Sequence, residues 1–187
     1  MKILNIFKHI KVITKHKWIV FKLCCKVGEP WRGFVHDWSK FSPEEFWEGV
    51  KYFNGHKSPI TVCKKENGYS KAWLHHKGRN KHHAEYWVDL ALEKPAIIMP
   101  YKYAAEMICD KMAAGITYEG KNWKKETELN YYKIEREHSL IDEHLDNFLM
   151  AFFIEVSKYG LEKSLTKKNV KRLYEKYCIR MEELDEN

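Results

Sequence analysis

Residues 35–41 read Val-His-Asp-Trp-Ser-Lys-Phe, and the rest of the fold is predicted outward from this stretch. A histidine followed directly by an aspartate offers a metal ion a borderline imidazole nitrogen and a hard carboxylate oxygen. On a helix, His36 and Asp37 would point about 100° apart, so they could serve one ion or bridge two. Lys40 follows one turn later, where its ammonium could reach a phosphate held on the metal. Most His-Asp pairs are surface residues, so the prediction depends on further ligands elsewhere.

The composition is typical of a packed globular protein. The chain has 187 residues, of which 44% are hydrophobic and 14% aromatic, which favours one helical domain with a buried core. No segment is long and apolar enough to span a membrane. The first nine residues show no long apolar run and no small-residue cleavage site, so no signal peptide is expected. Five irregularly spaced cysteines favour reduced thiols in a cytoplasmic protein.

The apolar periodicity before the His-Asp pair predicts one long helix from Leu4 to Val27. His16 falls on its apolar side, where it would be either a core histidine or a metal ligand. Most of the lysines lie on the opposite side, and Lys17 breaks this pattern. A second, short helix is expected over residues 31–40, carrying His36 and Asp37.

A third helix is predicted to begin after Ser42, which can cap it, with Pro43 in the first turn and Glu45 completing a capping box. Residues 56–69 are expected to be mostly loop, with a short helix as the alternative. Residues 72–87 then hold four of the ten histidines, bracketed by Trp and Tyr residues. The segment could be a polar loop, but the aromatic flanks favour packing it inward, where neutral imidazoles suit a metal site.

A further helix is predicted from Pro100 to Ala114, closed by Gly115. Asp110 lies on its otherwise apolar face, and an unpaired buried carboxylate costs several kcal/mol, so it must have a partner. A metal ion, an arginine or a helix N-terminus would serve. The remainder is expected to form helices near residues 123–136, 139–159 and 166–183, so that a metal-site core over residues 4–115 is followed by C-terminal helices over residues 118–187.

The ordered set of candidate ligands resembles that of the HD-domain superfamily. Members place a His on one helix, a His-Asp pair on the next, optional histidines after that and an Asp on a later helix. The candidates here are His16, His36, Asp37, His76, His82, His83 and Asp110. More closely still, the patterns H-D-x-S-K-F and N-x-H-H-x-E-Y-W resemble a family of small bacterial and phage proteins of uncharacterised function, over roughly residues 10–114. The double His also resembles a step of the HD-GYP phosphodiesterases, but the G-Y-P signature is absent, so cyclic dinucleotide hydrolysis is not implied.

The resemblance implies an all-α, HD-domain-like helical bundle with a central metal site and phosphohydrolase activity through a metal-bound hydroxide. One or two divalent ions are expected, from Mn, Fe, Co, Ni or Zn, with Asp37 as the bridge. One ion would take His16, His36 and Asp110. The other would take His76 and His82 or His83. His76 is preferred over its neighbour His75, which is expected to face packing or solvent, but the sequence leaves the choice between the two open. Lys40 and Arg79 would grip the phosphate of a small molecule or nucleotide.

Two other functions remain open at this point. Some two-metal members of the same superfamily are diiron oxygenases with nearly the same ligands. The net charge of +7 also fits a basic nucleic-acid-binding module without catalysis, because the first 30 residues hold seven Lys against one Glu. A lysine stripe is more often a solvated face, so nucleic-acid binding is the less favoured of these readings. The oligomeric state is not predicted.

Overall fold

The computed structural model describes residues 3–179, and this part of the chain is all-α, as the sequence predicts. The helices of the first two thirds are α1 (Ile3–Lys26), α2 (Pro30–Val35), α3 (Pro43–Lys51), α4 (Pro59–Asn67), α5 (Lys71–Lys77) and α6 (Tyr101–Glu119). Those of the last third are α7 (Thr127–Glu135), α8 (Glu143–Tyr159), α9 (Leu161–Ser164) and α10 (Lys167–Cys178). The end of the predicted helix over residues 166–183 lies outside the described residues.

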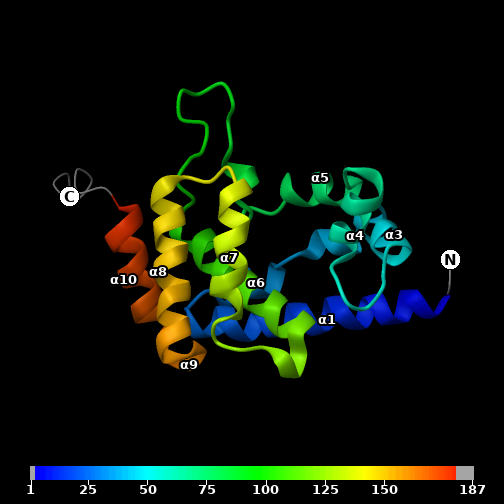
Figure 1. Cartoon of the computed structure of the whole chain (residues 1–187), viewed down its shortest axis with the longest axis horizontal. Coiled ribbons are helices and arrows are strands. Elements are labelled where there is room, and N and C mark those ends of the chain that lie inside the picture. Colours follow the sequence, from blue (N-terminus) through cyan, green and yellow to red (C-terminus); the bar gives the residue numbers. More distant parts are fainter. Residues whose placement is uncertain (1–2, 180–187) are drawn as a thin grey trace.

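Helix α1 runs along one side of the molecule, and most of the other helices lie above it in the view of Figure 1. Helices α3, α4 and α5 gather near its N-terminal end, and α7, α8 and α10 stand near its C-terminal end. Helix α6 packs against α1, α2, α7 and α10, so it connects α1 with the C-terminal helices. Because α6 contacts elements on several sides, it is apolar on most of its surface, and eight of its residues are buried.

The C-terminal helices close the core. Phe148, Phe152 and Phe153 of α8 are fully buried, at the spacing of one helix face. Thr166 caps α10, as predicted, by accepting a hydrogen bond from the backbone N–H of Asn169 at 3.3 Å. Within the described residues, no helix combines the length and the hydropathy that a membrane crossing requires.

One predicted boundary is wrong, and residues 56–69 contain more helix than expected. Residues 56–69 contain a nine-residue helix, α4, begun by Pro59 and ended by Gly68 in a left-handed conformation. Gly115 does not end its helix, because α6 continues to Glu119. A Cβ at Gly115 would overlap the carboxylate of Glu128 on α7, so this glycine permits a close approach of two helices.

Candidate metal centre

The His36-Asp37 pair lies in a turn, and the prediction of a continuous helix over residues 31–40 is wrong. Helix α2 ends at Val35, Asp37 takes a left-handed backbone with φ of 51°, and a 3₁₀ turn follows over Trp38–Phe41. The side chain of Lys17 on α1 donates a hydrogen bond to the carbonyl oxygen of His36. Lys17, which does not fit the pattern of its own helix, therefore stabilises the turn.

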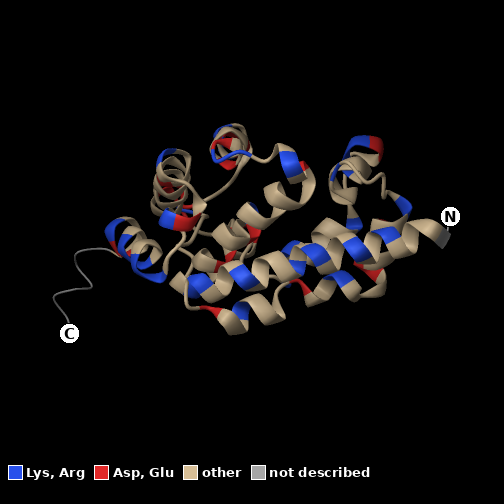
Figure 2. Ribbon diagram, turned by 90° about the horizontal axis from the view of Figure 1, so that it is seen from below, with Lys and Arg blue, Asp and Glu red and all other residues tan. Residues whose placement is uncertain are grey.

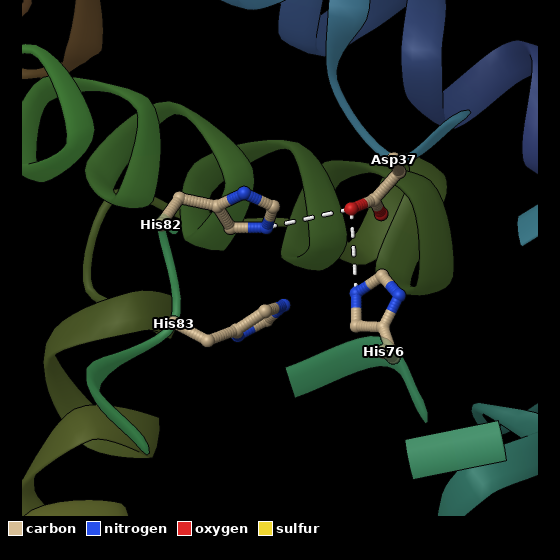
Figure 3. Close-up of side chains that lie close together, drawn as sticks. All are labelled: Asp37, His76, His82 and His83. Atoms are coloured by element: carbon tan, nitrogen blue, oxygen red, sulfur yellow. Dashed lines mark ion pairs between the residues drawn. The ribbon is translucent and has the colours of Figure 1, made fainter. Parts of the chain in front are cut away.

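Asp37 is buried between two groups of histidines. Its Oδ1 atom lies 3.3 Å from His76 Nε2 and 3.4 Å from His82 Nε2, and Figure 3 marks both interactions with dashed lines. The ring of His83 extends into the same space (Figure 3). One nitrogen or oxygen atom from each of these four residues falls within 4.8 Å of the others. We name Asp37, His76, His82 and His83 cluster B.

The second carboxylate oxygen of Asp37 faces a different group of side chains, which includes His36. Asp37 Oδ2 lies 3.2 Å from His36 Nε2. His16 Nε2 on α1 lies 3.0 Å from Asp110 Oδ1 on α6, and His36 Nε2 lies 3.4 Å from that same oxygen. One nitrogen or oxygen atom from each of His16, His36, Asp37 and Asp110 lies within 4.8 Å of the others. We name these four residues cluster A. The structure thus brings together all seven residues predicted as ligands, with Asp37 common to both clusters.

The distances between these atoms are those of ligands around an ion. Two ligand atoms about 2.1 Å from one ion, at tetrahedral or octahedral angles, lie about 3.0–3.4 Å apart. The atom pairs that link Asp37 and Asp110 to His16, His36 and His76 fall in this range. Five buried atoms that face the clusters make no hydrogen bond of good geometry among the described residues, although charged partners lie 3.0–3.4 Å from four of them, and they are His16 Nε2, His36 Nε2, Asp37 Oδ1, His82 Nε2 and His83 Nε2. Buried polar atoms without partners are rare, so this donor set fits a metal ion.

Two glutamates orient the histidines from the other side of the rings. Glu106 Oε1 lies 3.0 Å from His36 Nδ1 and 3.2 Å from His82 Nδ1. Its Oε2 atom accepts from Arg32 Nε at 2.7 Å. An ionised carboxylate only accepts, so the hydrogen of the His36 ring is drawn to Nδ1 and its Nε2 is left for a ligand role, while His82 Nδ1 lies at ion-pair distance without hydrogen-bond geometry. Because Glu106 faces Nδ1 atoms and is already paired with Arg32, we assign it an orienting role.

Glu45 orients the two histidines of α5 in the same way. Its carboxylate lies 2.7 Å from His76 Nδ1 and 2.7 Å from His75 Nδ1. Ser42 caps α3, as predicted, by accepting from the backbone N–H of Glu45. The predicted role of the Glu45 side chain in a capping box is wrong, because that side chain bonds the two histidines. His75, expected to face packing or solvent, is half-buried and anchored to Glu45.

The electrostatics of the clusters favour a bound cation. Burial lowers the pKa of the His36 imidazole, but the neighbouring carboxylates, led by Asp37, raise its pKa well above the ordinary value. The carboxylates around His36 therefore stabilise a positive charge on its ring. A metal ion bound to Nε2 would supply that charge in place of a proton. Burial lowers the pKa of His16 and, together with His82 and His76, that of His83 well below its ordinary value. Both imidazoles are thus neutral at neutral pH, as metal ligands must be.

The two predicted substrate-binding residues differ in placement. Lys40 Nζ lies 2.6 Å from Asp37 Oδ2, at the edge of both clusters. Burial lowers the Lys40 pKa, but Asp37 and Asp110 raise it above its ordinary value, so this side chain remains an ammonium. Arg79 is exposed, and its guanidinium lies 3.5 Å from the carbonyl oxygen of His75. The structure therefore places Lys40 in the site and leaves Arg79 outside it.

Sequence reasoning missed Glu106 and misassigned Glu45. Glu106 lies four residues before Asp110 on α6, so both point to the same side of the helix. That spacing, on a helix otherwise rich in buried apolar residues, was the available signal. The signal at Glu45 was hidden, because a glutamate three residues after a serine cap is a common surface pattern.

The comparisons with known proteins point to one family. Residues 5–155 match the model described as a family of unknown function (DUF5662). Neither a curated protein nor a solved structure matches the chain. The matched region contains every residue of clusters A and B, together with Glu45, Glu106 and Lys40. Since the match covers well over half of its length, the chain belongs to the DUF5662 family.

Proposed function

We propose that this protein is a metal-dependent phosphohydrolase of the HD-domain type, with two divalent ions as its cofactor. The observation that carries the proposal is the position of Asp37. Its two oxygens face separate sets of histidine nitrogens, 3.2 Å from His36 Nε2 and 3.3 Å from His76 Nε2. A carboxylate shared in this way suits a pair of ions held close together.

Separate residues would bind the ions, orient the histidines and hold the phosphate. Cluster A would hold one ion and cluster B the other, with Asp37 as the shared ligand. Bound divalent ions would lower the pKa of a water molecule and offset charge on phosphoryl oxygens. Glu106 and Glu45 keep the histidine Nε2 atoms turned inward. Because its raised pKa keeps Lys40 charged, this residue acts as an electrostatic clamp on a phosphate and not as a general base.

The test combines metal analysis with an activity screen. The protein is purified without added metal, its metal content is measured, and phosphate esters and nucleotides are screened with Mn²⁺, Fe²⁺, Co²⁺, Ni²⁺ and Zn²⁺ in turn. We expect metal-dependent release of phosphate or of a phosphomonoester. The variant His56→Ala removes an exposed histidine outside both clusters, and it serves as the control for nonspecific metal binding.

Two results would count against the proposal. Full metal occupancy in folded Asp37→Ala protein would refute the shared-ligand geometry. A protein that holds two irons, consumes oxygen and releases no phosphate from any of the esters would instead be a diiron oxygenase.

A further inference from the structure

A row of exposed aromatic side chains begins beside the metal centre. Trp31 is 68% exposed, Phe34 55% and Trp38 55%, and Phe41 is also exposed. Their ring centroids follow one another at 5.7, 6.3 and 6.1 Å. We name Trp31, Phe34, Trp38 and Phe41 the aromatic ladder. Four large apolar rings in contact with one another on the surface mark an interaction site, because isolated exposed rings are common but contiguous groups are not.

The local structure explains why the ladder faces outward. Gly33 of α2 packs on α1, where a Cβ would lie 2.7 Å from Cys24 Cβ and 2.8 Å from Phe21 Cα. On the inner side of α2, Arg32 reaches the buried Glu106. With these two sides occupied, Trp31 and Phe34 are left on the outer side. The indole N–H of Trp38 donates to the carbonyl oxygen of Phe34 at 3.0 Å, which holds that ring in the row.

Positive charge adjoins the ladder. Helix α1 carries six lysines and no acidic residue, and Figure 2 shows the basic positions along the whole helix, with no acidic position between them. Lys17 Nζ lies 5.1 Å from the centroid of the Trp38 ring, and Lys22 Nζ lies 5.9 Å from that of Trp18. Ammonium groups therefore lie on the face of one ladder ring, Trp38, and on that of Trp18 in α1, which packs against α2.

We propose that the aromatic ladder and the lysines of α1 bind single-stranded nucleic acid. Rings that stand free on the surface can stack on unpaired bases of any sequence, and lysines beside them can follow the phosphate backbone. A duplex offers no such base faces, because its bases are already stacked on one another. No residue of the ladder belongs to cluster A or cluster B, so this function does not depend on hydrolysis.

Two other occupants fit the surface less well. An interfacial helix separates its aromatic residues from its lysines on opposite faces. Here Trp18 shares one side of α1 with Lys11, Lys15 and Lys22, so inserting the ring into a lipid surface would carry the lysines with it. A second copy of the chain, related by a twofold axis, would bring the same lysines against each other.

The test measures binding in the absence of catalysis. Fluorescence anisotropy is recorded with a fluorescein-labelled 15-mer of oligothymidylate, in EDTA, so that a metal-dependent reaction cannot consume the probe. We expect Trp38→Ala and Phe34→Ala each to weaken binding about tenfold. We also expect Lys15→Glu with Lys22→Glu to weaken it and to reduce its salt dependence. All four side chains are exposed, and circular dichroism checks that each variant is folded.

Matched controls separate stacking from general charge. Trp47→Ala removes an exposed tryptophan of α3 outside the ladder, and Lys65→Glu with Lys133→Glu makes the same charge change on α4 and α7, outside α1 and the ladder. Both controls should bind the probe within twofold of the parent. Weaker binding of a duplex of equal length would support the proposal.

Three outcomes would overturn it. Trp38→Ala and Phe34→Ala could bind the oligonucleotide as tightly as the parent. The aromatic rings would then not contribute, and nonspecific charge attraction would explain the binding. The protein could bind vesicles containing phosphatidylglycerol and not the oligonucleotide, which would make the surface a membrane contact. The parent could sediment as a dimer that Trp38→Ala abolishes, with no oligonucleotide binding, which would make it a self-association surface.

Discussion

Replacing Glu106 by Gln tests whether one carboxylate orients both candidate metal sites, clusters A and B. Glu106 Oε1 lies 3.0 Å from His36 Nδ1 in cluster A and 3.2 Å from His82 Nδ1 in cluster B, while its Oε2 binds Arg32. A glutamine cannot satisfy both sides. If its oxygen faces the histidines, its NH₂ group meets the guanidinium, and if it is flipped, its NH₂ group meets two ring N–H groups. In either orientation, the NH₂ group of the glutamine faces other buried N–H donors and no acceptor.

The structure sets the size of the effect. Burial raises the pKa of Glu106, but the two histidines lower it to about 2, against 4.5 when exposed. A difference of about 2.5 units corresponds to about 3 kcal/mol of folding stability. Because the folded pKa is depressed, this stability is present above pH 4.5 and is lost as the pH falls toward 2. We therefore expect metal-free Glu106→Gln to lose about 3 kcal/mol at pH 7, and its metal affinity to fall about 10–100-fold.

The assay pairs urea denaturation of the metal-free protein with titration by Co²⁺, followed in its visible absorption. Glu119→Gln is the matched control, because this residue is exposed at the end of the same helix. The reasoning is refuted if folded Glu106→Gln binds Co²⁺ as tightly as the parent and loses less than about 0.5 kcal/mol, the range of ordinary surface substitutions.

Three further predictions follow from the same contacts. Lys40→Ala should retain its metal and lose at least tenfold in turnover of a phosphoester, because an ammonium group attracts anions and cannot ligate a cation; equal turnover would exclude the proposed role of Lys40 as a phosphate clamp. Asp37→Ala should lose bound metal while remaining folded, whereas His75→Ala should keep it, and metal per chain with circular dichroism distinguishes them. Burial raises the pKa of Glu128 to about 7, so the parent loses stability as the pH rises from 4.5 to 7. Glu128→Gln should therefore be more stable by up to about 3 kcal/mol at pH 8 and nearly unchanged at pH 4, as thermal denaturation at both pH values would reveal.

The candidate ligands on long helices could be predicted from the sequence. His16 and Asp110 each interrupt an apolar face with 3.6-residue periodicity, and such faces meet in the core, as α1 and α6 do. Their separation of 3.0 Å follows from two polar groups being buried at one helix crossing. The helical fold class could be predicted for the same reason, because the apolar periodicity is strong over most of the chain.

The supporting residues could not be predicted, because their roles depend on contacts between distant segments. Lys17 donates to the carbonyl oxygen of His36, 19 residues away. Glu45 meets His76 across 31 residues, and Glu106 meets His36 across 70. Lysines and glutamates are common on solvated helix faces, so nothing local distinguishes these from surface charges. The choice between His75 and His76 was also open in the sequence, and α5 resolves it by directing His76 Nε2 toward Asp37.

The turn at Asp37 explains why adjacent residues can share one site. On a helix, the side chains of His36 and Asp37 would diverge by about 100°, but here His36 Nε2 and Asp37 Oδ2 are 3.2 Å apart. The left-handed backbone of Asp37 brings them together at a cost of roughly 1 kcal/mol, which aspartate tolerates better than most residues. Contacts on both sides offset that cost, since Lys17 binds the preceding carbonyl oxygen and the Lys40 N–H donates to Asp37 O at 3.1 Å. Backbone strain held by surrounding contacts in this way is typical of functional sites, and here it lies at the one carboxylate that both clusters share.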